Sequence, residues 1–401
     1  MSRPQSNNIA FKLLSPVLSP NKLPKKIIFG KFQIVKLIWK GPFSSVYIGK
    51  YLKEKKYVAI KIQDKNANLC QLEKEAYYQY LLKGPGIPKV LSFGRSGTNH
   101  ILVETLLGKT LKQLFDLNKN PQSKMKDMCM AAVQIMDRIK FIHSKNIIHQ
   151  DIKPENFLVG NPNTSIIYIV DFGLSKKYRS SRTKKHIQFS KNKPFNGTFN
   201  YSSINSMRGI EMTRRDDLES IGYMLIFLIK GKLPWSEYLN QELGVRFEII
   251  YNIKSNISNE VLCKGLPNEM CEYMDYVKSL KFDEEPNYDE LKKLFISILD
   301  NMNEKCDFNF SWSKKKVKKH NFSLMTSFQH FREKSLSRFF SYKKGTSLSK
   351  SLSRCEYEED ENKNKYKYKY AKKYLDTSKS FGKSNKKERS VGNFFVNSLY
   401  K

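Results

Sequence analysis

The chain lacks any hydrophobic run long enough to cross a membrane. The longest apolar stretch, Ile221 to Ile229, has nine of the 401 residues, whereas a spanning helix needs about 20. No apolar segment follows the basic residues near the amino terminus, Ser2 excludes myristoylation, and the final SLYK is no prenylation motif. We therefore expect no signal peptide and no membrane anchor.

Cysteine is scarce, and its spacing excludes two kinds of site. The six cysteines form no C-x-x-C pair and show no zinc-ligand spacing. Unpaired thiols are typical of reducing compartments. We expect reduced cysteines in a protein of the cytoplasm, the nucleus or both.

Acidic residues are few relative to basic ones. The chain has 38 Asp and Glu against 72 Lys and Arg, a formal net charge of +34. Residues 301–401 carry 25 basic and 10 acidic side chains, hence 25 − 10 = +15. A basic surface favours acidic partners without selecting among them. We expect acidic partners for this tail and do not expect nucleic acid as the main partner.

Apolar residues form 40% of the chain, enough for a large core, and their pattern predicts two lobes. The runs FQIVKLI, VYIGKYL, YVAIKIQ and HILVE predict strands, with one helix at QLEKEAYYQYLL. Later, helical spacing predicts core positions at Met128, Ala132, Ile135, Met136, Ile139 and Ile142. The sequence predicts an α+β chain with a small β-rich lobe (about 28–104) and a larger, mainly helical lobe (about 108–300).

Both ends of the chain differ in composition from this core. Residues 1–27 are rich in Ser, Pro, Asn and Lys, and residues 301–401 in Lys, Ser and Asn. We expect an amino-terminal extension and a basic tail that are largely disordered. SKKKVKKH at 313–320 is a candidate nuclear import signal or nucleic-acid patch, with a solvated linker as the alternative.

Six polar residues carry chemistry suited to phosphoryl transfer, which depends on positioning and on neutralising charge. They are Lys61 in VAIK, Glu75 on the following helix, Asp151, Lys153 and Asn156 in HQDIKPENF, and Asp171 in DFG. Lys61 can hold the α- and β-phosphates of ATP, and Glu75 can fix its ammonium. Each motif alone is ordinary, but this order and spacing indicate a bilobal protein-kinase fold.

Four residues of the second lobe are expected to fill the remaining roles in phosphoryl transfer. Asp151 can accept the proton of the attacking hydroxyl, and Lys153 can stabilise the transferring phosphoryl group. Asn156 and Asp171 supply hard oxygen ligands for Mg²⁺. We predict these four residues as catalytic, and the last two as metal ligands.

Eight further stretches narrow the assignment. They are GIP (86–88), IHSKN (142–146), NFLVG (156–160), DFGLSKKY (171–178), SSIN (202–205), RRDDLESIGYML (214–225), LPW (233–235) and EVLCKGLP (260–267). With them, the stretch from about Ile28 to Trp312, about 70% of the chain, resembles a casein kinase I family serine/threonine kinase. SSIN replaces the Ala-Pro-Glu of most kinases.

The resemblance implies activity on Ser or Thr in protein substrates that are acidic or already phosphorylated. It implies ATP contacts from Ile38, Gly41, Val46, Ala59, Lys61, Glu75, Leu107 and Leu158. The positions of Lys153 and Thr198 agree with Ser/Thr rather than Tyr specificity, and Asp217 matches the residue that braces the catalytic loop. We expect a monomer.

The loop expected to cover the phosphates departs from the family. The family has G-x-G-x-F-G, whereas WKGPFS at 39–44 keeps only Gly41. Trp39 and Ser44 replace glycines, which let backbone amides approach phosphates, and Pro42 has no N–H. We expect weaker nucleotide binding. The alternative function is a pseudokinase scaffold with weak or no ATP turnover.

Positive charge is missing from two other places. Gln150 replaces an Arg that binds a phosphate on the activation segment and makes no bond in the reaction, so we expect activity without that phosphorylation. Asn200 stands where the family has an Arg of the substrate anion site, and Leu243 and Gly244 replace a basic pair. We expect a reduced preference for phosphate-primed substrates.

Two features remain open or peripheral in the sequence. Counting back from Gly108 makes Glu104 the gatekeeper residue, whereas aligning on the glutamate makes it Val103. The buried carboxylate of the first alternative would be costly.

In the tail, SLSRCEYEEDE at 351–361 predicts phosphorylation of Ser351 or Ser353 by the protein itself, with inhibition of the kinase by the modified segment. The alternative is a tail that takes no part in regulation.

Overall fold

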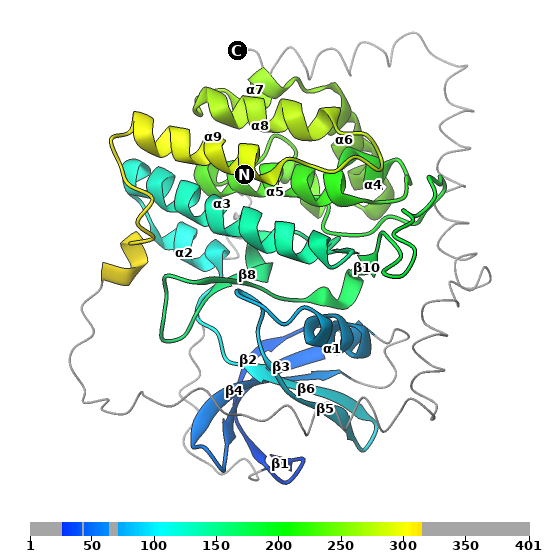
Figure 1. Ribbon diagram of the computed structural model, residues 1–401, viewed down its shortest axis with the longest axis vertical. Coiled ribbons are helices and arrows are strands. Elements are labelled where there is room, and N and C mark those ends of the chain that lie inside the picture. Colours follow the sequence, from blue (N-terminus) through cyan, green and yellow to red (C-terminus); the bar gives the residue numbers. More distant parts are fainter. Residues whose placement is uncertain (1–25, 42–43, 64–70, 315–401) are drawn as a thin grey trace, which may run out of the picture.

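The computed structural model describes residues 26–41, 44–63 and 71–314, which form two lobes joined near residues 106–109 (Figure 1). The lower lobe in this view is a sheet with one helix, and the upper lobe is mainly helical. The predicted α+β, bilobal architecture is confirmed.

The small lobe contains a six-stranded antiparallel sheet in the order β1-β2-β3-β4-β6-β5. Its strands are β1 (Ile27–Ile28), β2 (Phe32–Lys40), β3 (Ser44–Tyr51), β4 (Lys56–Gln63), β5 (Val90–Ser96) and β6 (Asn99–Thr105). The predicted helix is α1 (Gln71–Leu81). Strands β1 and β5 are additions to the four predicted runs. Strand β1 has only two residues, and VLSFGRS of β5 contains a glycine and an arginine and has few strand formers.

Side chains alternate between the two faces of this sheet, and each face has its own apolar cluster. One face carries Val58, Ile60 and Val103 in a buried cluster. The other face packs Leu102 and Val90 against Leu72 and Ala76 of α1. The face that carries α1 is therefore also the face that carries Lys61, which alternates with Ile60 along β4.

The large lobe is built from helices around one core. The helices are α2 (Leu111–Leu117), α3 (Pro121–Ser144), α4 (Ile204–Met207), α5 (Arg214–Lys230), α6 (Leu243–Asn256), α7 (Asn259–Cys263), α8 (Asn268–Ser279) and α9 (Tyr288–Asn301). Every residue from 216 to 226 of α5 is buried, as the apolar pattern on all its sides predicts. The six core positions predicted for α3 are all fully buried.

Two short strand pairs flank the loops at 149–156 and 170–175. They are β7 (Ile147–Ile148) with β10 (Lys176–Lys177), and β8 (Phe157–Val159) with β9 (Ile167–Ile169). The hinge between the lobes contacts β8 directly, because Gly108 N donates to Val159 O at 2.8 Å. A Cβ at Gly108 would lie 2.9 Å from Val159 Cγ2, so this close approach requires glycine.

Packed residues continue beyond the predicted end of the lobe at residue 300. Phe310 is fully buried, and its ring stacks on Trp312 at 4.4 Å. Ser311 N donates to the buried Asp127 Oδ1 of α3 at 2.9 Å. The described part of the large lobe therefore extends to residue 314.

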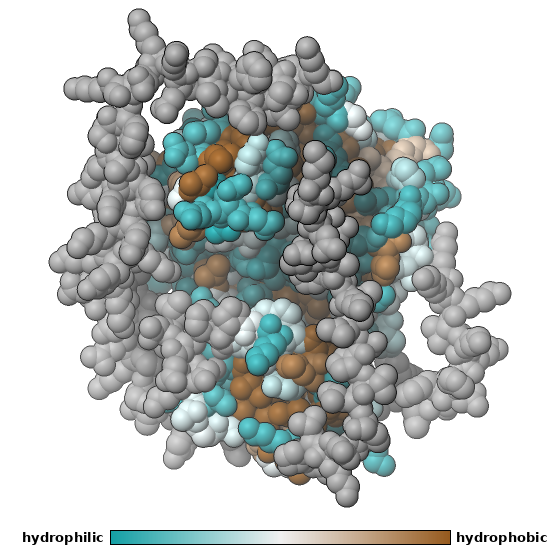
Figure 2. Space-filling model, turned by 180° about the vertical axis from the view of Figure 1, so that it is seen from behind, coloured by the Kyte–Doolittle hydropathy of each residue, from teal (hydrophilic) through white to brown (hydrophobic). Residues whose placement is uncertain are grey.

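Hydrophobic surface gathers over the small lobe when the molecule is seen from behind (Figure 2). Exposed apolar side chains of β2 include Val35, Leu37, Ile38 and Trp39. None of the described helices is long and apolar enough to span a bilayer. The predictions for residues 1–25, most of 313–320 and 351–361 lie outside the described residues.

Candidate active site

One carboxylate of the buried helix α5 holds the loop between β7 and β8. Asp217 Oδ2 accepts from His149 N at 2.7 Å, and Oδ1 accepts from Gln150 N at 2.9 Å. His143 Nε2 lies 3.0 Å from Asp217 Oδ2. Burial alone would raise the pKa of Asp217, but these partners lower it below its ordinary value. The expected brace under the catalytic loop is present.

Gln150 is held in an unusual backbone conformation by this brace. Its φ is +68°, in the left-handed region that non-glycine residues rarely adopt. The residue is buried, and its carbonyl oxygen lies 3.0 Å from where a Cβ on Gly197 would be. Such strain is tolerated where surrounding contacts determine the backbone. It turns the chain immediately before Asp151.

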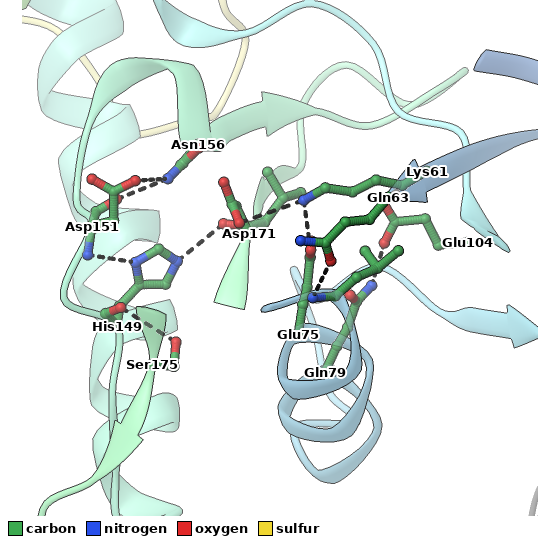
Figure 3. Close-up of polar contacts among 12 residues, drawn as sticks. Lys61, Gln63, Glu75, Gln79, Glu104, His149, Asp151, Asn156, Asp171 and Ser175 are labelled. Carbon is green, nitrogen blue, oxygen red and sulfur yellow. Dashed lines mark hydrogen bonds and ion pairs between the residues drawn. The ribbon is translucent and has the colours of Figure 1, made fainter. Parts of the chain in front are cut away.

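Asp151 is the centre of a polar cluster (Figure 3). Lys153 Nζ lies 2.5 Å from its Oδ2, and Thr198 Oγ1 donates to its Oδ1 at 2.8 Å. Asn156 Nδ2 donates to the Asp151 carbonyl oxygen at 2.8 Å. Burial alone would lower the pKa of Lys153, but Asp151 and its acidic neighbours raise it. The carboxylate therefore faces a cation and keeps acceptor capacity for a hydroxyl.

A second cluster joins strand β4 to helix α1 and to the start of the DFG turn. Lys61 Nζ lies 2.5 Å from Glu75 Oε2 and 3.5 Å from Asp171 Oδ1 (Figure 3). Burial would lower the pKa of Lys61, but Asp171, Glu75 and Glu104 raise it. For Asp171, Lys61 lowers the pKa although burial opposes it. Lys61 is thus a charged ammonium between two carboxylates.

Asp171 and Asn156 fit the chemistry of a Mg²⁺ site. Asp171 adopts a left-handed conformation (φ +68°) and its side chain is partly exposed between the lobes. Because Asn156 uses its Nδ2 on Asp151, its Oδ1 remains as a neutral oxygen donor. Carboxylate and amide oxygens suit Mg²⁺, which usually takes only one or two protein carboxylates. Among the described residues no group of three or more His, Cys, Asp or Glu could hold a metal.

The predicted ATP contacts come from three segments. Val46 of β3 pairs with Lys61 of β4, and Ala59 shares the face of Lys61 two residues away. Leu107 lies in the hinge, which is hydrogen-bonded to the strand that contains Leu158. Val46, Ala59 and Lys61 thus share one face of the sheet, while the contact of the predicted residues with ATP stays a prediction. Ile38, on β2, is about half exposed.

The register of β4 and β6 settles the open gatekeeper position. Ala59 pairs with Glu104, and Ile60 pairs with Val103. Paired residues share a face of the sheet. Val103 therefore belongs to the cluster on the far face, and Glu104 belongs to the face of Lys61. Glu104 is the gatekeeper residue, and burial raises its pKa above the ordinary value.

The glycine of the phosphate-covering loop lies against a tryptophan. A Cβ on Gly41 would come within 2.2 Å of Trp39 Cη2, in the indole ring. Trp39 pairs with Val46, so it lies on the face of the sheet that carries Lys61. Gly41 N donates to Ser44 O at 2.8 Å, whereas Pro42 and Phe43 lie outside the described residues. The side chain of Trp39 is thus present at a position where the resemblance leads us to expect a glycine.

The substrate-side positions carry no positive charge. Asn200 is buried, and its Oδ1 accepts from Ser236 Oγ at 3.1 Å. Its carbonyl oxygen accepts from Trp235 Nε1 at 2.8 Å. Leu243, at the start of α6, is 65% exposed and presents an apolar side chain. Two of the three expected substitutions, Asn200 and Leu243, are therefore placed, but their effect on substrates stays a prediction.

Two residues of the site carried no signal in the sequence. Gln79, on α1, donates from Nε2 to Glu104 Oε2 at 2.5 Å. Gln63 Oε1 accepts from Leu72 N at 3.0 Å and so holds the amino-terminal turn of α1. A glutamine in a helix or strand is ordinary, and only the fold reveals that these two face the site.

Comparison with known proteins agrees with this geometry. Residues 32–322 match the model of the protein kinase domain. Over 285 residues the chain is 39% identical to Casein kinase I homolog 2 of Schizosaccharomyces pombe. The match covers 70% of this chain and 65% of that relative, so the chain spans about two thirds of the relative's length.

Proposed function

The chain belongs to the protein kinase family and is a relative of casein kinase I, and from this premise we propose that it transfers the γ-phosphoryl group of ATP to Ser or Thr of acidic proteins. The observation that carries the proposal is the position of Asp151. Its carboxylate is held by Lys153 and Thr198. It lies in the same interlobe site as the Lys61–Glu75 pair (Figure 3).

Each residue of the site has a task in this reaction. Lys61, fixed by Glu75, binds the phosphates of the nucleotide from the small lobe. Asp151 accepts the hydrogen bond, and then the proton, of the substrate hydroxyl. Lys153 keeps positive charge beside the group in transfer. Asn156 and Asp171 would hold Mg²⁺, which when bound would neutralise charge on the phosphate oxygens.

The charge of the activation segment supports acidic substrates. Residues 176–193 contain eight Lys and Arg and no Asp or Glu. Arg182, Lys184, Lys185 and Lys191 of this segment are exposed. An acidic chain passing toward Asp151 would meet this charge, which speeds encounter. Asn200 and Leu243 offer no charge to a priming phosphate.

The contacts of the catalytic loop support activity without phosphorylation of the activation segment. Asp217 holds the backbone before Asp151, and Thr198 bonds its carboxylate directly. Neither contact uses a phosphate. The residue that would read such a phosphate is Gln150, which carries no charge.

The test is Mg²⁺-dependent transfer of labelled phosphate to casein and to matched peptides. We expect transfer to Ser in acidic peptides, little added rate from a priming phosphoserine, and no loss after phosphatase treatment of the protein. The Asp171→Asn variant is the blank. ATP binding without any transfer would instead favour the pseudokinase scaffold, and a phosphatase-sensitive rate would refute the independence from activation-segment phosphorylation.

Replacing Trp39 with Gly is expected to lower the KM for ATP by roughly tenfold, about the effect of one charge-assisted hydrogen bond. The change removes the indole that lies against Gly41 and lets the loop backbone approach the phosphates. The control is Leu37→Gly, which puts glycine in the same strand on the opposite face, where Leu37 pairs with Tyr47. An unchanged or higher KM for Trp39→Gly would contradict this account of the loop.

A further inference from the structure

One buried and one partly buried carboxylate lie on the side of Lys61 at the inner end of the nucleotide site. Glu75 comes from α1 and Glu104 from β6, and both lie on the face of the sheet that carries Lys61. Burial raises the pKa of both acids, which the positive charge of Lys61 opposes. Both charges act on Lys61, yet its ammonium forms its short contact, 2.5 Å, with Glu75.

The second carboxylate has a different partner. Gln79 Nε2 donates to Glu104 Oε2 at 2.5 Å (Figure 3). It also donates to Pro88 O at 3.0 Å. Both neighbours are acceptors, so the amide must present its nitrogen to them. Gln79 is 2% exposed, and among the described residues no donor reaches its Oε1. The side chain keeps this orientation although its own acceptor, Oε1, is left without a partner among the described residues.

Gln79 lies four residues after Glu75, so the two side chains share one face of α1. From this arrangement we propose that Gln79 is a positioning residue for the nucleotide site, because its amide engages Glu104 and thereby leaves the ammonium of Lys61 to Glu75. The proposal rests on the proposed kinase function. It assigns a role to a residue that touches neither nucleotide nor substrate.

The physical reason is the cost of leaving a partly buried carboxylate without a hydrogen-bond partner. Without the Gln79 amide, Glu104 would lose the one hydrogen bond that its carboxylate makes to a described side chain in the structure. Such a carboxylate then either takes a proton or finds another cation. The cation that acts on Glu104 is Lys61. Glu104 would then compete with Glu75, and Lys61 would shift away from the position in which α1 holds it.

The experiment is a double-mutant cycle on Gln79 and Glu104. We expect Gln79→Met, which keeps the size of the side chain, to raise the KM for ATP and lower kcat, together at least about tenfold in kcat/KM. Removing the competing acid as well, in Gln79→Met with Glu104→Met, should restore most of that loss. Glu104→Met alone should lie closer to the wild type than Gln79→Met does. A rescue of this sign cannot come from two merely structural losses, which would add.

A matched control is present on the same helix. Glu73 is also buried, but its carboxylate bonds Arg95 at 3.3 Å and lies 3.2 Å from His100 Nδ1. Glu73→Gln should leave the KM for ATP unchanged within about twofold, because it removes an acid of α1 without changing the partners of Lys61. A double variant as defective as Gln79→Met, or a Gln79→Met variant like the wild type, would overturn the proposal.

Folding and function are separated by two further measurements, thermal unfolding and equilibrium binding of ATP. A folded double variant beside an unfolded Gln79→Met supports the proposal, since the unpaired acid is then the defect. Loss of folding in both would assign Gln79 a structural role through Pro88 and overturn it. If the wild type binds ATP but transfers no phosphate, the proposed function fails. In that case the same ranking of ATP affinities sustains the positioning role, and equal affinities refute it.

Discussion

Replacing Asp151 with Asn is expected to lower kcat by about 10² to 10⁴-fold, the usual worth of a positioned general base. The amide has nearly the shape of the carboxylate, so the hydrogen bond from Thr198 Oγ1 can persist on its oxygen. It cannot take the proton of the substrate hydroxyl, and it leaves Lys153, now 2.5 Å from a carboxylate oxygen, without its counter-ion. The rate should fall while the fold remains.

The measurement is steady-state transfer to an acidic peptide, with thermal unfolding recorded on the same samples. The matched control is Asp137→Asn on α3, where the carboxylate pairs with Lys292 at 2.8 Å and is partly exposed. That variant loses one negative charge of the large lobe without touching the site, so its kcat should match the wild type. Near-normal turnover by Asp151→Asn would remove this residue from the mechanism.

The sequence predicted those elements whose signal is local. The helix predicted near DDLESIGYMLIFLIKG (216–231) is expected to be buried on all sides because apolar residues surround it, and the burial of every residue from 216 to 226 of α5 confirms this. The six polar residues of the site were recognisable because each kinase motif is short and lies at a fixed interval from the next. The structure brings them into the two clusters around Asp151 and Lys61.

Features that depend on pairing across the chain were out of reach. The choice between Val103 and Glu104 is a shift of one residue, which moves a side chain to the other face of a sheet. Only the pairing of Ala59 with Glu104 decides it. The same holds for Phe310, which lies in a polar stretch that reads as a tail but is buried in the large lobe.

The chemistry that surrounds the motifs was equally hidden. Gln79 reads as an ordinary helical residue, because its partners Glu104 and Pro88 are strand or loop residues 25 and 9 positions away. A buried polar side chain is explained by its partners, and partners are a property of the fold. This is why the proposed positioning role could be drawn from the structure alone.

Replacing Asp217 with Asn is expected to cost about 1 to 3 kcal/mol in the free energy of unfolding, as when a buried backbone donor is left without an acceptor. The carboxylate accepts from the backbone N–H groups of His149 and Gln150 and lies 3.0 Å from His143 Nε2. In either orientation an asparagine presents an N–H to a backbone N–H. Against a total stability of about 5 to 15 kcal/mol, such a loss is large.

The loss of this brace should also reach the reaction. Gln150 keeps its φ of +68° because the carboxylate of Asp217 holds its N–H, and Asp151 follows directly. We therefore expect kcat to fall in the folded fraction of Asp217→Asn as well, measured below its unfolding temperature. A folded variant with normal kcat would show that the loop holds its conformation without the carboxylate.

The neighbouring residue provides the control and the pH dependence. Asp216 is equally buried, but it accepts from Thr213 N and Ser203 Oγ, and burial raises its pKa to about 6. Since a raised pKa means that the folded state favours the neutral acid, the wild type should lose stability relative to Asp216→Asn as pH rises through about 6.

The pH dependence expected for Asp217 has the opposite sign, because the pKa of Asp217 is lowered in the folded state. Its stabilisation is present above the unfolded pKa of about 3.9 and is lost as pH falls through the folded pKa. The gap between the wild type and Asp217→Asn should thus narrow only in acid, and a gap that narrows as pH rises from neutrality would contradict the charged brace.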